Sequence, residues 1–505
     1  MNSKTTRIFK NTFVLYLRMA FTMLVTLYTS RITLNVLGVS DYGINNVVAG
    51  TISFLSFLMY SMNTATQRFL NIAMSRNDDE ELRHVFSVSI TIHVIILVLV
   101  VIIGEVVGLW LLYNKLVIPP ERMEAAFWVF QFTMISTATA VMTVPYNAEV
   151  IAHEKMSIYA YFSIMDTILK LLIVYLLVIS PYDKLISFGF MYMCTFILNR
   201  VIYTIYCKRT FKECRYSIHF PRKLFKEMIS FAGWDLFGVF AWACSTQGLT
   251  ILLNIFFGPV VNAARAIAGQ VVGVIKGFTG NFSTALNPAI TKAYGAREYG
   301  YMTKLMYSGS KLIFILLFTM MLPLFIKCHY VLKLWLNMVP EYSVAFIQIL
   351  IIQSVIQTMW NPLFVSGLAT GKIRQFGLIT SCLMIIKLAA AYIIMKMGAS
   401  PVWTVAIISL WELLAYGVQH YTLGRLTDYS FSDYFQKVLR PTLLVIVLVG
   451  LSTYWFNTLL NDSIPHLILL CCVSCPLSLL LSYILLLNHE ERQFVKRTIK
   501  TRLSK

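Results

Sequence analysis

The sequence predicts an all-α polytopic membrane protein, and three observations lead to that fold class. Of the 505 residues, 58% are hydrophobic and only 13% are charged. The mean hydropathy of +0.71 is far above the balance of a soluble globular protein. Apolar segments of about 20 residues, the length that a helix needs to cross a bilayer, recur along the whole chain.

Fourteen segments are long and apolar enough to be predicted as membrane spans. In chain order they are 12–37, 44–66, 86–113, 125–150, 157–179, 185–206, 229–256, 259–290, 305–327, 343–366, 375–396, 402–422, 441–458 and 465–487. The first follows a basic N-terminus but has no small-residue cleavage site, so we interpret it as an anchor and not as a removable signal peptide. An even number of spans predicts that both termini lie on one side of the membrane.

The positive charges indicate which side that is. Most of the 42 Lys and Arg fall in connections and tails that a cytoplasmic N-terminus would place inside the cell. The positive-inside rule therefore predicts that both termini are cytoplasmic. The richest connection is CKRTFKECRYSIHFPRKLFKEM, residues 207–228. We attribute much of the net charge of +19 to orientation and to anionic lipid head groups, and we expect no nucleic acid partner.

Two pairs of windows indicate an internal duplication. The stretch PYNAEVIAHEKMSIYAYFSIMDTILKLLIVY from Pro145 aligns without gaps on PLFVSGLATGKIRQFGLITSCLMIIKLAAAY from Pro362, at a shift of 217 residues. A second pair of windows, beginning at Asn46 and Asn262, aligns at a shift of 216. Both copies begin on the same side, so we predict two parallel six-helix bundles, with two helices added at the C-terminal end.

This duplication predicts four parts of the chain. They are an N-terminal six-helix bundle (1–206), a basic cytoplasmic linker (207–228), a C-terminal six-helix bundle (229–422), and two additional transmembrane helices with a basic cytoplasmic tail (423–505). A central cavity is expected between the two bundles.

Basic side chains fall inside the predicted spans, where a charge costs roughly 2.5–3.5 kcal/mol on insertion scales. The candidate substrate-binding residues are Arg18, Arg31, Lys170, Arg265, Lys276 and Lys387. Acids inside the spans are fewer, so ion pairing cannot neutralise all of these cations. A diphosphate could complete the balance, because Arg and Lys both suit phosphate. The repeat pairs Lys170 with Lys387, and we expect these two to flank a cationic cavity that holds an anionic head group.

Structural alternatives stay open for several of these residues. Arg18, Arg31 and Arg265 lie within about two turns of a predicted interface, so their long side chains could instead reach the head-group region. Lys170 could pair with Asp166, one turn earlier on the same helix.

Asp235, in the stretch SFAGWDLFG, is the candidate for ion coupling. It sits two turns inside the seventh predicted span, near the repeat position of Arg18. A carboxylate within the membrane could bind a coupling proton or sodium ion. A plain ion pair between an Asp and an Arg is equally consistent with the sequence.

The eighth predicted span contains a glycine stripe. Gly269, Gly273 and Gly277 recur every four residues, a spacing that permits close approach of a neighbouring helix. We therefore predict close helix packing along this stripe in preference to a flexible hinge.

Motifs for catalysis or cofactor binding were not found. There is no phosphate-binding loop, and the eight His and nine Cys show no zinc spacing. The CCVSC stretch lies in an apolar span and indicates buried free thiols. We therefore predict no catalytic residue, no metal ligand and no cofactor, and a protein that is not an enzyme.

The stretches RITLNVLGVSDYGINNVVAGTISFLSFL and VNAARAIAGQVVGVIKGFTGNFSTALNPAITKAYGA, the duplicated bundles and the two extra helices resemble the polysaccharide flippase family. That family belongs to the multidrug, oligosaccharidyl-lipid and polysaccharide (MOP) exporter superfamily. The resemblance implies translocation of undecaprenyl-pyrophosphate-linked oligosaccharide repeat units across the bacterial cytoplasmic (inner) membrane by alternating access. The product would be O-antigen of lipopolysaccharide, capsule or another exopolysaccharide. Implied partners are membrane lipids, H⁺ or Na⁺ as coupling ion, and polysaccharide polymerase machinery.

Two other classes of function remain as alternatives. An ion-coupled multidrug exporter of the same fold would transport mostly cationic substrates, which favours an acidic cavity over the basic excess seen here. A membrane polymerase or ligase would normally need a sizeable outside loop with active-site residues, and the predicted outside loops are short.

Overall fold

The computed structural model describes residues 3–76, 78–153, 155–217, 221–369, 373–427, 429–493 and 496. Several side chains within these helices lie outside the description, among them those of residues 3–18, 234–235 and 278–285. The described chain consists of helices and their connections, without a strand. The prediction of an all-α polytopic fold is confirmed.

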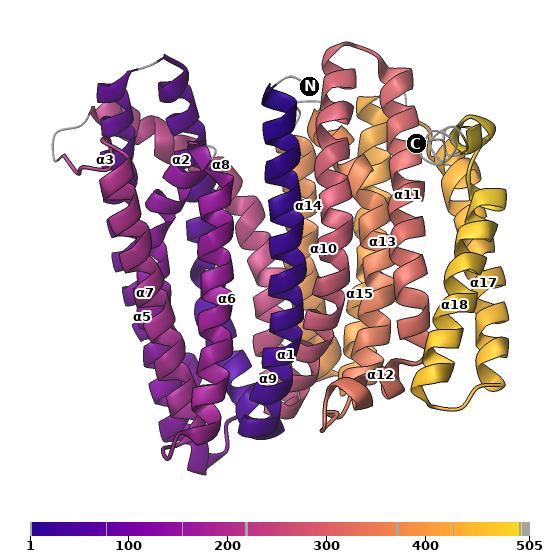
Figure 1. Ribbon diagram of the computed structural model, residues 1–505, viewed down its shortest axis with the longest axis horizontal. Helices are drawn as coiled ribbons and strands as arrows, with labels where there is room; N and C mark the ends of the chain where they lie inside the picture. Colours follow the sequence, from indigo (N-terminus) through magenta and orange to yellow (C-terminus); the bar gives the residue numbers. More distant parts are fainter. Residues whose placement is uncertain are drawn as a thin grey trace. The chain divides into compact units, whose positions relative to one another are not determined.

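The N-terminal part of the chain contains the helices α1 to α8 (Figure 1). Their bounds are α1 Ser3–Ser53, α2 Phe57–Arg76, α3 Asp79–Ile103, α4 Leu109–Asn114, α5 Met123–Ala152, α6 Met156–Ile179, α7 Lys184–Thr210 and α8 Arg222–Ala243. Single turns of 3₁₀ or π-helix join some of them, at Phe54–Ser56, Gly104–Gly108 and Pro120–Arg122. Acidic caps define two of the starts. The carboxylate of Asp78 accepts hydrogen bonds from the first turn of α3, and that of Asp183 does so for α7.

The remaining chain contains the helices α9 to α18. Their bounds are α9 Leu249–Phe257, α10 Pro259–Gly295, α11 Tyr299–Ile326, α12 Cys328–Trp335, α13 Ser343–Ala369, α14 Ile373–Lys396, α15 Pro401–Leu426, α16 Phe431–Tyr434, α17 Arg440–Thr458 and α18 Ile464–Leu481. Three π-helical turns continue or precede these helices, at Cys244–Gly248, Phe435–Leu439 and Ser482–Leu486.

The described residues contain 12 segments that are long and apolar enough to cross a membrane, against the fourteen predicted. One cause is that a single segment, Phe21–Met74, covers the first two predicted spans, because the chain bends there and continues as helix. The other cause is the predicted span 259–290, which coincides with α10 but is not among the 12.

Helix bounds repeat at the offset that the sequence predicted. The C-terminal ends of α6 and α14, Ile179 and Lys396, are displaced by 217 residues. The starts of α7 and α15 are displaced by the same number. Pro145 and Pro362 lie inside α5 and α13 at this offset too. The duplicated design therefore extends from the sequence to the secondary structure.

Near its start, each copy is interrupted at a glycine with a positive φ angle. Helix α1 is broken at Gly38, where φ is 76°, and Gly258, with φ 80°, separates α9 from α10. A residue with a side chain is strained in this region, whereas glycine is not. The two breaks lie close together in space, because a Cβ added to Gly43 would lie 1.9 Å from the carbonyl oxygen of Pro259.

The chain divides into two compact units. Unit 1 comprises Met1–Ala266, Leu336–Glu341 and Met384–Pro401, and unit 2 comprises Ile267–Trp335, Tyr342–Leu383 and Val402–Lys505. Helices α10 and α14 contribute residues to both units. The predicted boundaries of the two bundles concern the duplication and stay a prediction.

Unit 1 is built on helix pairs that pack along much of their length. Helix α5 packs on α7, α1 on α6, and α2 on α3, α5 and α8. At one end of the unit, Arg122, which directly precedes α5, joins α1 to the connection between α6 and α7. Its guanidinium binds both carboxylate oxygens of Asp41, which follows the break in α1, with N–O distances of 2.9 and 2.5 Å. It also binds Asp183, at 2.6 and 3.2 Å, between α6 and α7.

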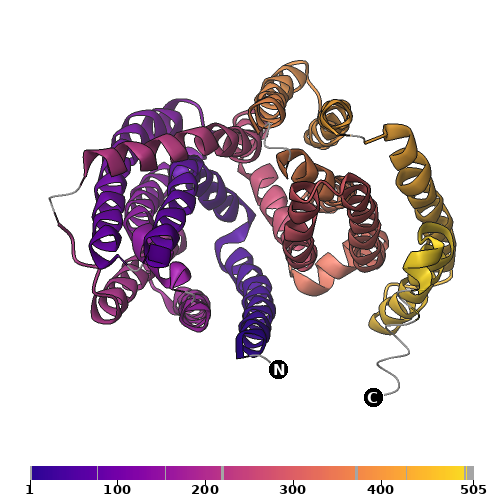
Figure 2. The same cartoon turned by 90° about the horizontal axis from the view of Figure 1, so that it is seen from above.

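Unit 2 holds the two additional helices against its own core. Helix α11 packs on α13 and α18, and α17 and α18 lie side by side (Figure 2). The buried ammonium of Lys311 on α11 lies 3.1 Å from Glu491, after α18. Lys327, which directly follows α11, lies 2.6 Å from Asp462 between α17 and α18. These ion pairs fasten both ends of the additional helices to α11.

Candidate functional site

Helix α10 carries two of the predicted cations on one face. Arg265, Gly269, Gly273 and Lys276 follow each other at spacings of four, four and three residues, so they form a single stripe along the helix. We call these four residues the α10 stripe. It extends about 16 Å, at a rise of 1.5 Å per residue.

The glycines of the α10 stripe are not in close contact with another helix. A Cβ added at Gly269 or at Gly273 would meet nothing within 4 Å, and both glycines are exposed. The prediction of close helix packing is therefore wrong at these two positions. The same spacing that permits packing also leaves an open groove along a helix when no partner fills it.

The two cations of the stripe have different surroundings. The ammonium of Lys276 donates to the amide oxygen of Gln357 on α13, 2.7 Å away. Arg265 is partly buried, and no hydrogen bond or ion pair of its guanidinium is found among the described residues. A partly buried guanidinium in a membrane protein without a carboxylate partner is costly unless an anion or water completes its contacts.

Arg31 on α1 is held by a neutral partner. Its Nη2 donates to Oδ1 of Asn337, in the connection after α12, at 3.1 Å. The hydroxyl groups of Tyr28 and Tyr175 are 2.8 Å apart, so α1 and α6 are joined close to Arg31.

Lys170 forms the local ion pair that the sequence left open as an alternative. Its ammonium lies 2.7 Å from the carboxylate of Asp166, one turn earlier on α6. The rings of Tyr192 and Phe196 on α7 lie 5.3 and 5.9 Å from the same ammonium. Asn199 donates to the other oxygen of Asp166, at 2.6 Å. This network stabilises the α6–α7 packing, and substrate binding by Lys170 stays a prediction.

Lys387, the repeat mate of Lys170, is one of the most buried charged residues of the described chain. Its exposed fraction is 8%, and its side chain is not without a partner. Leu388, the next residue on α14, packs against Gly248, where an added Cβ would lie 2.8 Å from a Leu388 methyl carbon. The tight packing at this point fixes the orientation of α14 and therefore of Lys387.

Two predicted site residues lie outside the described side chains. Arg18 is on α1 and Asp235 is on α8, and the structure describes only their backbone. Their assignments to substrate binding and to ion coupling stay predictions.

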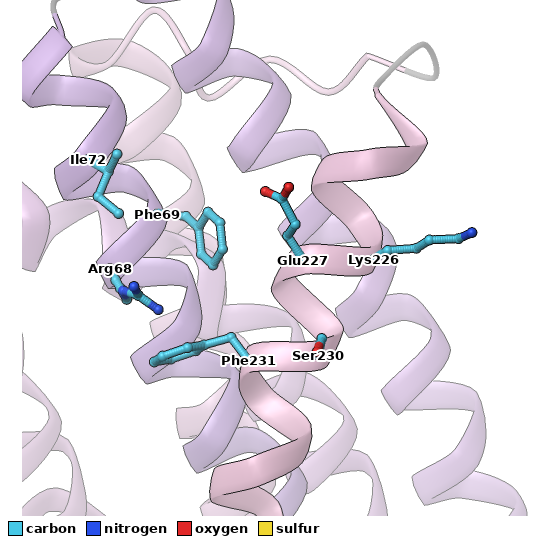
Figure 3. Close-up of a pocket in the computed structure, with 7 residues that line it drawn as sticks. All are labelled: Arg68, Phe69, Ile72, Lys226, Glu227, Ser230 and Phe231. Atoms are coloured by element: carbon cyan, nitrogen blue, oxygen red, sulfur yellow. The ribbon is translucent and has the colours of Figure 1, made fainter. Parts of the chain in front are cut away.

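Unit 1 contains an open pocket of about 580 Å³ between the C-terminal half of α2 and the first turns of α8 (Figure 3). Its lining is basic and aromatic: Arg68, Phe69, Ile72, Lys226, Glu227, Ser230 and Phe231. The guanidinium of Arg68 lies 4.3 Å from the centre of the Phe231 ring, a cation–π contact that orients the charge. The sequence analysis did not identify this pocket, because its residues come from segments about 160 positions apart.

The family comparison decides which class of protein this is. Residues 8–294, more than half of the chain, match the model of a family described as "Polysaccharide biosynthesis protein". The chain belongs to this family. No curated protein sequence matches this chain.

Solved structures with a similar fold are membrane transporters. The lipid II flippase MurJ in an inward closed conformation gives a TM-score of 0.68 at 12% identity, covering 93% of this chain and 98% of that chain. An inward-facing multidrug resistance MATE family transporter of the MOP superfamily gives 0.65 at 13% identity, covering 82% and 99%. A MOP superfamily transporter from Pyrococcus furiosus gives 0.59 at 13% identity, covering 83% and 97%. The chain therefore has the fold of the MOP transporters.

Proposed function

We propose that the protein is a flippase that moves undecaprenyl-pyrophosphate-linked oligosaccharide repeat units across the bacterial cytoplasmic membrane by alternating access. Membership of the polysaccharide biosynthesis family and the MOP transporter fold support a transporter over an enzyme. The product would be O-antigen, capsule or another exopolysaccharide. Both termini would be cytoplasmic, and membrane lipids and a polysaccharide polymerase would be its partners.

The α10 stripe is the observation that carries this proposal. A face with an arginine at one end and a lysine at the other would be costly against lipid tails. Two exposed glycines between them leave room along the helix backbone. A hydrated cavity that accepts an anion satisfies both conditions, because a diphosphate would complete the contacts of Arg265.

The multidrug exporter is the second candidate, on the fold alone. It predicts cationic substrates, for which carboxylates inside the membrane are the expected ligands. In the described structure, two of these acids are engaged by neutral donors. Glu105 accepts from Gln131 at 3.2 Å, and Glu412 accepts from Gln353 at 2.8 Å. The guanidinium of Arg265, which has no partner among the described residues, supports an anionic substrate.

The experiment measures transfer of a fluorescent polyprenyl-diphosphate sugar between leaflets of liposomes that contain the purified protein. The variants are Arg265→Gln and Lys387→Gln. Their matched controls are Lys292→Gln and Lys396→Gln, because each control removes an exposed cation from the same helix, α10 or α14. We expect transfer by the wild type and both controls, and at least about a tenfold slower rate for both site variants, which corresponds to ~1.4 kcal/mol.

Three outcomes would each contradict one part of the proposal. Absence of transfer by correctly inserted wild type under proton and sodium gradients would exclude the flippase activity. Wild-type transfer rates in both site variants would leave the flippase activity in place but would show that Arg265 and Lys387 do not bind the diphosphate. Transfer that is insensitive to both gradients would remove the coupling role proposed for Asp235.

A further inference from the structure

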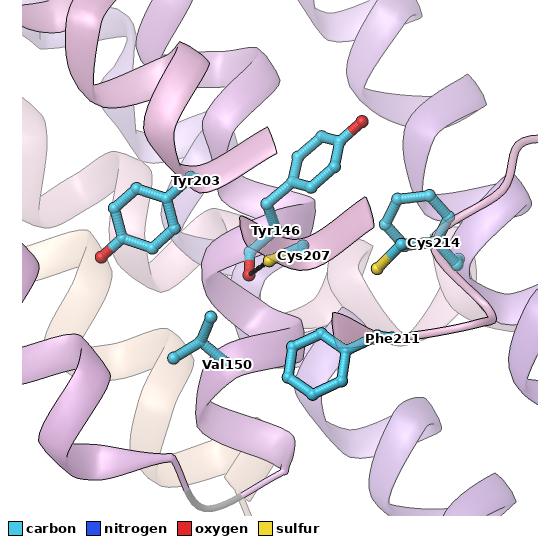
Figure 4. Close-up of a cluster of buried hydrophobic side chains, with 7 residues drawn as sticks. Tyr146, Val150, Tyr203, Cys207, Phe211 and Cys214 are labelled. Carbon is cyan, nitrogen blue, oxygen red and sulfur yellow. Dashed lines mark hydrogen bonds between the residues drawn. The ribbon is translucent and has the colours of Figure 1, made fainter. Parts of the chain in front are cut away.

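The C-terminal ends of α5 and α7 meet around a cluster of buried side chains (Figure 4). Its core is Phe86, Tyr146, Val150, Tyr203, Cys207, Phe211 and Cys214. Cys207 donates to the backbone carbonyl of Tyr146 on α5, which joins the two helices directly. The proposed topology places this cluster at the cytoplasmic end of the N-terminal bundle.

Three potential metal ligands lie at the edge of this cluster. Glu149 is in the last turn of α5, His153 directly follows that helix, and Glu213 lies in the connection after α7. One ligand atom from each can be chosen so that all three lie within 4.8 Å of one another. His153 Nε2 is 2.6 Å from Glu213 Oε1 and 3.7 Å from Glu149 Oε2. We call these three residues the Glu149 cluster.

The carboxylate of Glu149 is the unusual member. Its side chain is fully buried, and neither oxygen has a hydrogen-bond partner among the described residues. A buried carboxylate without partners is strongly unfavourable, so the site needs a cation or a proton at these oxygens. His153 is too far away, at 3.7 Å, to donate a hydrogen bond to Glu149 while it binds Glu213.

The surroundings favour a metal cation over a proton alone. The C-terminal end of a helix carries partial negative charge, and the cluster lies where α5 and α7 both end. His153 is stacked on Phe211, with 4.1 Å between ring centres, so its imidazole is held in place. An ordered imidazole and two carboxylates, one of them unpartnered, form the ligand set of a divalent metal site.

We propose that Glu149, His153 and Glu213 bind one divalent transition-metal ion of the zinc type. One nitrogen and two oxygen ligands suit Zn²⁺, whereas Mg²⁺ and Ca²⁺ prefer oxygen ligands only. Ligand atoms around tetrahedral Zn²⁺ are about 3.3 Å apart at bond lengths near 2.0 Å. The His153–Glu149 distance is close to this value already. The His153–Glu213 hydrogen bond would open by about 0.7 Å and lose its proton to solvent.

The metal would join the end of α5 to the connection that leads into α8. Glu149 lies in the last turn of α5 and His153 directly follows it, whereas Glu213 lies nine residues before Arg222, where α8 begins. A bound ion would therefore restrain the cytoplasmic linker against the N-terminal bundle. The fourth position is open to water or to a thiolate from Cys207 or Cys214, which are both buried in the adjacent core.

The test measures zinc bound by the full-length protein, purified in detergent without a polyhistidine tag. The protein is treated with a chelator, dialysed against buffered Zn²⁺, and analysed for metal per chain. We expect about one zinc per wild-type chain, and loss of that zinc in Glu149→Gln, His153→Gln and Glu213→Gln. Glu124→Gln is the control, because it removes an exposed carboxylate at the other end of α5.

A second measurement separates lost ligands from lost folding. Thermal unfolding without zinc reports whether each variant is folded, and added zinc should raise the unfolding temperature of the wild type and of Glu124→Gln only. Less than about 0.2 zinc per wild-type chain would overturn the proposal. Zinc retained at the wild-type level in folded Glu149→Gln and His153→Gln would also overturn it, because the ion would then lie elsewhere.

Discussion

Filling the open face of α10 is the perturbation that tests the site most directly. The double variant Gly269→Leu/Gly273→Leu adds two side chains where the structure has no atom within 4 Å of an added Cβ. Glycine in a helix interior costs roughly 0.5–1 kcal/mol relative to a better helix former. Two replacements without steric cost should therefore raise the free energy of unfolding by about 1–2 kcal/mol.

The same variant should lose transport. If the stripe lines the substrate path, two leucine side chains would narrow the path between Arg265 and Lys276. A steric cost of only ~1.4 kcal/mol in the transport barrier lowers the rate about tenfold. The assay pairs thermal unfolding of the purified protein with leaflet transfer of the polyprenyl-diphosphate sugar. We expect higher thermal stability together with slower transfer.

A matched control exists on another helix. Gly417 on α15 is also exposed and also has nothing within 4 Å of an added Cβ. Gly417→Leu should therefore raise the free energy of unfolding by about 0.5–1 kcal/mol, half the gain of the double variant, with unchanged transfer. The reasoning is refuted if the double variant unfolds at a lower temperature, since the stripe would then be packed. It is equally refuted if the double variant transfers the lipid at the wild-type rate.

Three further predictions concern the end of unit 1 where the glycine breaks lie. Arg122→Gln removes four hydrogen bonds to two half-buried carboxylates and should destabilise the protein by about 2 kcal/mol, measured as a lower unfolding temperature. A double-mutant cycle with Asp183→Asn should then show an interaction energy between the two side chains. Additive effects on stability would contradict the Arg122–Asp183 ion pair. Burial would raise the pKa of Asp183, but hydrogen bonds from Arg122 and the start of α7 outweigh it and hold the pKa below its ordinary value. Because the folded pKa is the lower one, this stabilisation is present above the unfolded pKa of about 3.9 and is lost as pH falls through the folded value. Thermal unfolding between pH 3 and 6 should therefore show an unfolding temperature that falls with pH in the wild type. Asp183→Asn should lack this part of the pH dependence. Gly43→Ala should be the most disruptive of the three, because its methyl group would lie 1.9 Å from a backbone oxygen of Pro259, and a normal yield of folded protein would contradict that close approach.

Hydropathy predicted the fold class and most spans because a lipid environment forces every backbone group into helix and leaves few other architectures. The repeat offset of 217 residues could also be predicted from the sequence, because the apolar pattern that the alignment compares also determines where the helices end. The separation of the first two spans was harder to predict. At Gly38 one residue with positive φ redirects α1 while the helix continues on both sides, and no polar loop marks the bend.

The candidate site was predictable in its residue types but not in its contacts. The Lys170–Asp166 pair could be proposed from the sequence because its partners are four residues apart on one helix. Arg31 and Asn337 are 306 residues apart, so no local pattern joins them. The stripe of glycines was misinterpreted because their spacing is identical in a packed interface and along an open face.

The Glu149 cluster shows a different limit. Glu149 and His153 are four residues apart, which is a usable spacing for two ligands on one helical turn. The third ligand, Glu213, comes from another helix connection, so the set does not match any compact zinc spacing in the sequence. Burial of Glu149 without a partner is visible only in three dimensions.

The repeated helices α6 and α14 differ in the residue that lies one turn before the shared lysine. Lys170 has kept, or acquired, an acid one turn earlier, whereas Leu383 stands at the corresponding place before Lys387. After a gene duplication, one copy can preserve a self-neutralised, purely architectural charge while the other is released to evolve toward a ligand. Substrate specialisation in this family would then be expected to accumulate unequally, with faster change on the α14 side and slower change on the α6 side.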